Sequence, residues 1–148
     1  MDKYVEKLNG FMEALGTMNM DTNRGSEYMV VKLQDGDRIL PSLAVYHASL
    51  SDKHPPEYWH PTLTETHWAR FETVAAKWFF EHKVMENLPE EMKKNLLAVF
   101  QDIINEMLGE YQVYELSTTP PVWYAALWDE FVFYSKYGIF LFHFSLYD

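Results

Sequence analysis

With 148 residues, the chain is long enough to bury a hydrophobic core, and we expect one domain over residues 1–148. It contains no cysteine, which excludes a disulfide framework and a thiolate nucleophile. The net charge of −10, from 22 acids against 12 lysines and arginines, opposes binding to the phosphate backbone of nucleic acids.

The sequence carries no signal for export or for membrane insertion. The residues that follow Met1 lack the apolar segment of a secretory signal peptide. The longest apolar run, Ile139 to Phe144, is too short to cross a bilayer as a helix. We therefore expect a cytoplasmic protein that does not bind membranes.

The first part of the chain predicts a helix followed by a β-hairpin. The helix has apolar residues at helical spacing and is expected to end at Gly16. These apolar residues are Tyr4, Leu8, Phe11, Met12 and Leu15. A strand is predicted over 27–33, and Asp35-Gly36 is a typical hairpin turn. The return strand would run over 38–46 at a sheet edge, because Pro41 has no N–H for the ladder.

Residues 47–63 form the longest irregular segment. It contains three prolines and the histidines His47, His54 and His60, and long loops of this kind are often functional. The histidines from His54 through His60 to His67 are farther apart than the three or four residues typical of zinc ligands on a helix. The spacing therefore argues against a metal site here.

Two amphipathic helices are predicted in the middle of the chain. A capping box at Thr62–Glu65 would begin the first, which buries Trp68, Phe71, Ala75, Trp78 and Phe79 and reaches His82. Asn87 would cap the second, and Gly109 would end it. The apolar stripe of this second helix is Met92, Leu96, Val99, Phe100, Ile103 and Met107. The short link between the helices makes them antiparallel neighbours.

The segment from Val122 to Tyr147 predicts a long hairpin on which the rest of the fold packs. Its aromatic and branched residues suit half-buried strands, and a tight turn is expected over 135–138. An even-numbered loop would place Phe131 and Phe133 beside the row Phe140, Phe142 and Phe144, whereas a three-residue loop would set Phe131 opposite His143. We favour the even loop because it makes one face entirely of phenylalanine.

Three polar residues lie within this apolar hairpin. His143 falls on its more polar face, where we expect it to be hydrogen-bonded or open to water. Asp129 and Glu130 are neighbours in one strand and point to opposite faces, so they would not act as an acid/base pair. One that points to a covered face would need a hydrogen-bond partner.

A further strand is predicted over 111–116, so the expected order is helix, two strands, two helices and three strands. This order favours an α+β fold, a mainly antiparallel sheet of about five strands with helices packed on one face.

Sequence motifs of catalysis are absent. There is no Gly-x-Ser-x-Gly elbow for a serine nucleophile and no glycine-rich loop for a nucleotide phosphate. We therefore expect a binding protein rather than an enzyme, without a cofactor and without a metal.

Aromatic and acidic side chains are the candidates for a binding surface. Aromatic residues make up 17% of the chain, and tyrosine and tryptophan often anchor interfaces. Between Asn95 and the end of the chain, seven acids stand against one base, Lys136, an imbalance that would steer the chain to a basic partner. The predicted binding residues are Tyr58, Trp59, Trp123, Tyr124, Tyr134, Tyr137, Asp102, Glu106 and Glu110.

These features lead to a first hypothesis and two alternatives. The first is a small acidic inhibitor, or an immunity or anti-defence protein, that blocks a basic site on a protein partner. The second is a small-molecule-binding domain or metal-dependent hydrolase that uses His47–His67. Mimicry of nucleic acid ranks lowest, because the acids are scattered and no acidic run exceeds two residues. Exposed aromatic residues would equally suit a homodimer contact.

Overall fold

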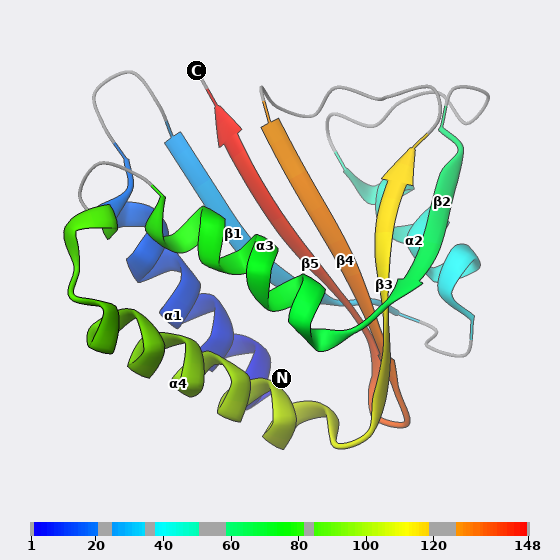
Figure 1. The fold of residues 1–148 in the computed structure, drawn as a ribbon. Coiled ribbons are helices and arrows are strands. Elements are labelled where there is room, and N and C mark those ends of the chain that lie inside the picture. The colour runs from blue at the N-terminus through cyan, green and yellow to red at the C-terminus, as the bar shows by residue number, and fades with distance from the viewer. Residues whose placement is uncertain are drawn as a thin grey trace.

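Five antiparallel strands form the sheet on which the fold is built (Figure 1). The structure is a computed structural model, and it describes residues 2–20, 25–34, 38–50, 59–81, 85–118 and 127–147. The strand order is β1–β5–β4–β3–β2, and each neighbouring pair is antiparallel. The strands are β1 (Gly25–Lys32), β2 (Pro61–Thr66), β3 (Tyr111–Thr118), β4 (Leu127–Ser135) and β5 (Gly138–Tyr147). The predicted α+β fold is confirmed.

Helices lie on both faces of this sheet, whereas the sequence predicted them on one face only (Figure 1). One face is covered by α1 (Lys3–Met18), α3 (Trp68–Phe80) and α4 (Glu90–Leu108), with the short 3₁₀ turn η2 (Met85–Asn87) between the last two. The opposite face carries α2 (Ile39–Ser49). Within the described part of the chain, no helix is long and apolar enough to cross a membrane.

The turn between β4 and β5 fixes which side chains face the three-helix layer. Ser135 and Gly138 are paired, so the loop contains two residues, and Phe131 lies opposite Phe142. The even-numbered loop is therefore confirmed. Gly138 has a φ of 138°, and a Cβ there would lie 2.9 Å from the Cε of Lys32, so glycine suits this position both sterically and conformationally.

Phenylalanine rings fill the space between the sheet and the three helices. Phe71 of α3 meets the rings of Phe131, Phe133 and Phe142 edge-on, with centroid distances of 5.1, 4.8 and 5.1 Å. Edge-to-face contacts add about 0.5–1.5 kcal/mol per pair to the effect of burial. This core holds α3 against the centre of the sheet.

A smaller apolar cluster lies on the opposite face. Leu43 of α2 is buried there against strand residues. The buried members are Leu33, Leu43, Leu116, Val132, Ile139 and Leu141. Val132, Ile139 and Leu141 face this side because they alternate with the phenylalanines of β4 and β5.

The predicted return strand over 38–46 is wrong, because residues 39–49 form α2. Pro41 lies in the first helical turn, where the backbone N–H groups have no intrahelical partner and proline is tolerated. Leu43 and His47 are one helical turn apart, and both are buried. The helical period of these residues therefore predicts the observed structure better than the strand pattern does. The predicted turn at Asp35-Gly36 lies outside the described residues.

The predicted end of the first helix at Gly16 is also wrong. Gly16 is buried inside α1, which continues to Met18 and ends at Asn19. A Cβ on Gly16 would lie 3.5 Å from the carbonyl oxygen of Ser26, an ordinary contact distance. A Cβ would therefore fit between α1 and β1 at this position. The Asn19 backbone N–H donates to the last carbonyls of the helix.

Helix starts in the middle of the chain differ from the prediction. Thr62–Glu65 belongs to β2 and pairs with β3, so it is not a capping box; α3 begins at Trp68 after His67. Threonine favours strands, and pairing with β3 satisfies the backbone of this segment. Asn87 lies in η2, and Pro89 takes the cap position of α4. His82 is outside the described residues.

The apolar stripe of α4 is confirmed in its second half. Phe100, Ile103 and Met107 are buried, and Gly109 ends the helix with a φ of 62°. Met92 and Val99, however, are 49% and 46% exposed. The two helices α3 and α4 run in opposite directions, as predicted (Figure 1).

One edge of the sheet is closed by a side chain. Asn9 of α1 donates its Nδ2–H to the Val30 carbonyl oxygen at 2.9 Å, and its Oδ1 accepts the Val30 N–H at 2.7 Å. Val30 lies in β1, whose only neighbour in the described sheet is β5. The Asn9 amide therefore occupies backbone groups that a further strand would need, and it protects this edge from pairing.

Replacing Asn9 with alanine should destabilise the fold. It would leave the N–H and C=O of Val30 without partners in a partly buried place, at a cost of about 1–3 kcal/mol in the free energy of unfolding. Urea denaturation measures this, with Lys7→Ala at an exposed site of the same helix as the control. Equal stability of the two variants would contradict the role of Asn9.

Candidate functional site

The turn between β4 and β5 brings an exposed tyrosine next to the end of α4. Tyr137 is 55% exposed, and its backbone N–H bonds the Ser135 hydroxyl oxygen at 3.1 Å. A Cβ on Gly109, the residue that ends α4, would lie 4.0 Å from the Tyr137 ring. The pairing of Tyr111 with Ser135 also holds the start of β3 beside this turn. We call this part of the molecule the hairpin end.

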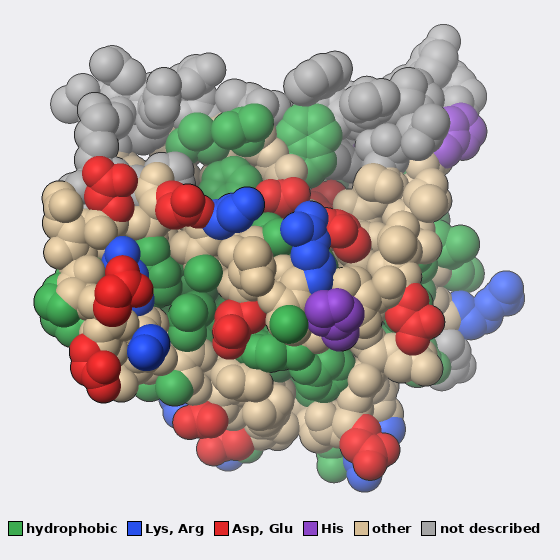
Figure 2. All heavy atoms as spheres, in the orientation of Figure 1, with side chains coloured by type: hydrophobic (Ala, Val, Ile, Leu, Met, Phe, Trp, Pro, Cys, Tyr) green, Lys and Arg blue, Asp and Glu red, His purple; other side chains and the backbone are tan. Residues whose placement is uncertain are grey.

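Exposed acidic side chains follow the second half of α4 toward the hairpin end. Asp102, Glu106 and Glu110 are all exposed, and the last turn of α4 contains no base. Figure 2 shows acidic side chains along the lower margin of the face that carries α4. Of these acids, Glu106 lies in the last turn of α4, where a negative charge opposes the helix dipole and lowers the stability of the helix.

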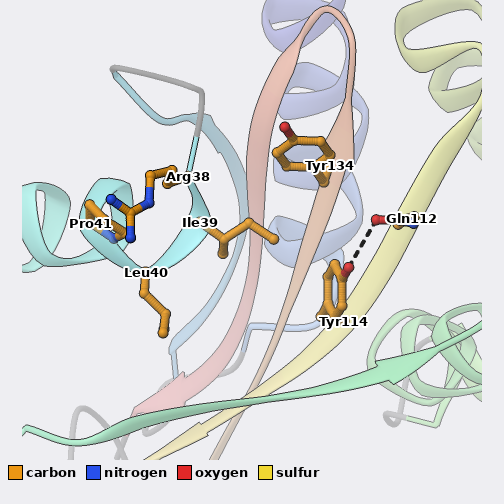
Figure 3. Close-up of a pocket in the computed structure, with 7 residues that line it drawn as sticks. All are labelled: Arg38, Ile39, Leu40, Pro41, Gln112, Tyr114 and Tyr134. Atoms are coloured by element: carbon orange, nitrogen blue, oxygen red, sulfur yellow. Dashed lines mark hydrogen bonds between the residues drawn. The ribbon is translucent and has the colours of Figure 1, made fainter.

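An open groove lies on the sheet face that carries α2 (Figure 3). Its volume is about 470 Å³. One wall comes from the start of α2 and the other from β3 and β4, and the lining residues are Arg38, Ile39, Leu40, Pro41, Gln112, Tyr114 and Tyr134. The Tyr114 hydroxyl donates to Gln112 Oε1 at 2.9 Å (Figure 3). The groove thus combines apolar and aromatic walls with a single cation, Arg38.

The nine predicted binding residues fall in different places. Tyr58, Trp123 and Tyr124 lie outside the described residues. Trp59 is half-buried and stacks on the buried His47 with ring centroids 4.3 Å apart, which is a packing contact. Tyr134 lines the groove and Tyr137 is exposed at the hairpin end, while Asp102, Glu106 and Glu110 are exposed on the second half of α4 and just after it.

Most of the groove was missed by sequence reasoning. Of its lining residues only Tyr134 is among the predicted binding residues, because the sequence predicts a strand from Arg38 onward. The helical spacing of Ile39, Leu43 and His47 is the signal that would have placed α2, and with it the groove wall.

The histidines of the alternative hypothesis do not converge within the described residues. His47 is buried, whereas His60 and His67 are exposed. His54 lies outside the residues that the structure describes. In the described ranges, no three histidine, aspartate or glutamate side chains gather as metal ligands would.

A buried pair of polar side chains crosses the hairpin on the α2 side of the sheet. Glu130 lies opposite His143, and its Oε2 is 3.0 Å from His143 Nδ1. Both residues are less than one-tenth exposed. The hydrogen-bonded histidine and the buried acid with a partner are both as predicted. Removing one member of such a pair is costly, because it leaves the other buried and uncompensated.

Asp129 points to the opposite face, toward α3. Its Oδ2 accepts a hydrogen bond from Trp78 Nε1 at 2.9 Å. Burial raises the pKa of the Asp129 carboxyl above its ordinary value of 3.8, while the Trp78 hydrogen bond opposes this and Glu115 adds to it. Glu115 itself bonds Arg70 at 2.9 Å. Asp129 therefore holds its proton to higher pH than an exposed aspartate does.

The raised pKa of Asp129 predicts a pH-dependent stability. The folded state binds this proton more tightly than the unfolded state, so stability falls as pH rises from about 4 through the folded pKa. Asp129→Asn should keep an acceptor for Trp78 and remove the loss of stability at higher pH. The difference in free energy of unfolding between the variant and the wild type should therefore grow, in favour of the variant, as pH rises. Urea denaturation from pH 4 to pH 7 measures the difference, with Glu13→Gln in α1 as the control. A difference that does not change with pH would contradict the assignment.

Comparison with known proteins indicates a shared fold without a family. No protein-family model matches the chain, and no curated protein sequence matches it. Two crystal forms of citrus MAF1 are similar in structure, each at 14% sequence identity, with TM-scores of 0.59 and 0.60. The first alignment covers 98% of this chain and 99% of the other, and the second covers 97% and 98%. At this identity the likeness shows the fold alone.

Proposed function

We propose that this chain is a protein-binding protein that occupies a basic site on its partner and thereby blocks it. The observation that carries the proposal is the open groove between α2 and the sheet, next to the hairpin end. Tyr134, which lines the groove, lies in β4 one residue before the turn that carries Tyr137 begins at Ser135. A partner held in the groove would therefore lie close to the turn that carries Tyr137.

The side chains that line the groove are of the kind that bind proteins. Tyrosine and arginine are enriched where interfaces contribute most of their binding energy. Leu40 is 49% exposed at the start of α2, and burying it would remove apolar surface from water. The groove is open rather than enclosed, which suits a segment of a protein better than a small molecule.

The charge of the chain favours a basic partner. The net charge is −10, and the exposed acids Asp102, Glu106 and Glu110 stand at the end of α4. Such a field raises the rate of encounter with a basic surface and suppresses wrong partners. The local cost to helix stability is consistent with a surface that serves binding.

The groove proposal is tested by matched substitutions in α2. Leu40→Lys should remove an apolar contact and add a charge that repels a basic partner, lowering recovery of the partner about tenfold or more. Val45→Lys is the control, because Val45 lies on the same helix, is 50% exposed, and does not line the groove. Tagged proteins are used to isolate partners from lysate of the natural host at low salt, and mass spectrometry measures the partner. Equal recovery with both variants would contradict the groove as the binding site.

The acidic end of α4 gives a second test, which uses the purified partner. Asp102→Lys combined with Glu106→Lys should slow association about tenfold at low salt and weaken its salt dependence. Of the two changes, Glu106→Lys should also stabilise the free chain by about 0.3–1 kcal/mol, because Glu106 lies in the last turn of α4, where an acid opposes the helix dipole. Stopped-flow kinetics at two ionic strengths and thermal unfolding measure the two effects.

A control pair carries the same change of net charge elsewhere. Glu13→Lys and Glu27→Lys alter exposed acids of α1 and β1, and Glu27 pairs with Ser145 near the end of β5, away from the turn. If both pairs slow association equally, overall charge rather than the hairpin end steers the partner.

A further inference from the structure

The direction of each backbone group in the sheet follows from the two-residue turn. Residues that flank such a turn form a hydrogen-bonded pair, so Ser135 and Gly138 bond each other across β4 and β5. Successive residues of a strand direct their N–H and C=O groups alternately to the two neighbours. The same alternation predicts that Leu33 bonds β5, and its N–H does bond the Ile139 carbonyl oxygen at 2.8 Å.

Extending this alternation through β4 and β3 assigns the groups of β2. In β4, Ser135 and every second residue before it bond β5, and the residues between them bond β3. In β3, the residues that do not bond β4 bond β2. The bonded pairs between β3 and β2 are Val113 with Thr66, Glu115 with Thr64 and Ser117 with Thr62. The N–H and C=O groups of Leu63 and Glu65 therefore point out of the sheet.

The outer edge of β2 differs from that of β1. On β1, the Asn9 amide bonds both outward groups of Val30. On β2, no described residue donates to or accepts from the backbone groups of Leu63 and Glu65. Two donors and two acceptors thus lie in one row along this edge, the arrangement that binds an added strand.

Charge favours a basic segment of another protein over a second copy of this chain as the strand that binds this edge. Glu65 is exposed and is the only charged residue of β2, and the chain as a whole carries −10. A second copy of the chain would bring like charges together, whereas a lysine or arginine opposite Glu65 makes a favourable cross-strand pair.

We infer that β2 binds an extended basic segment of a partner protein, which adds to the sheet as a sixth strand through the backbone of Leu63 and Glu65. This site is on the sheet edge and does not depend on the groove. Affinity comes from backbone hydrogen bonds, and the preference for a basic segment comes from Glu65 and the surrounding negative field.

The test uses a short capped peptide of alternating lysine and valine. In the wild-type chain, the peptide should slow hydrogen exchange at the Leu63 and Glu65 amides about tenfold, measured by NMR. The same peptide with N-methylated backbone at alternate residues keeps its charge but cannot pair, and it should leave exchange unchanged. Equal binding of both peptides would overturn the inference, because attraction would then be electrostatic alone.

Two substitutions at one position separate charge from backbone pairing. Glu65→Thr keeps the outward N–H and should weaken peptide binding about two- to fivefold. Glu65→Pro removes that N–H, which an edge strand tolerates, and should abolish binding. Equal binding by both variants would overturn the inference.

Sedimentation of the free chain adds a further check: a dimer that Glu65→Pro dissociates would assign the edge to a second copy instead. If Glu65→Pro does not fold, the peptide comparison on the wild-type chain decides.

Discussion

The two-residue turn at Lys136-Tyr137 is the constraint on which the rest of the structure depends. Side chains alternate along a strand, so the length of this turn decides which residues of β4 and β5 share a face. With two residues, Phe131 and Phe133 join the phenylalanines of β5 under α3, and Glu130 joins His143 on the other side. One residue more would move Glu130 to the face of the phenylalanine rings and away from His143.

The two faces of the sheet are thereby covered differently. The face under α1, α3 and α4 is filled by aromatic rings and is closed to a partner. The opposite face has a thinner cover from α2, a buried polar pair and the open groove. Binding surfaces are thus expected on the α2 side and at the sheet margins, where side chains and backbone are accessible without disruption of the core.

The sequence predicted the features that depend on neighbours along the chain. The phenylalanine register of the hairpin, the buried stripe of α3 and the stop at Gly109 follow from local spacing. Helix α2 was missed because its branched residues and Pro41 resemble an edge strand, and only packing of Leu43 on the sheet decides otherwise. The groove could not be predicted, because it joins Arg38 to Tyr134 across most of the chain. The contact of Trp78 with Asp129 is likewise nonlocal and depends on the completed fold.

The closure of β1 by Asn9 has a chemical consequence. Asn9 is followed by Gly10, the sequence in which an asparagine amide is lost most readily, since glycine leaves the attacking backbone nitrogen unhindered. Deamidation would replace the donor to the Val30 carbonyl with a carboxylate and open the edge. Within α1 the backbone of Gly10 is held in helical geometry, away from the arrangement that this cyclisation needs. The helix therefore protects the Asn9 amide from deamidation. Deamidation of Asn9 should be faster when α1 frays.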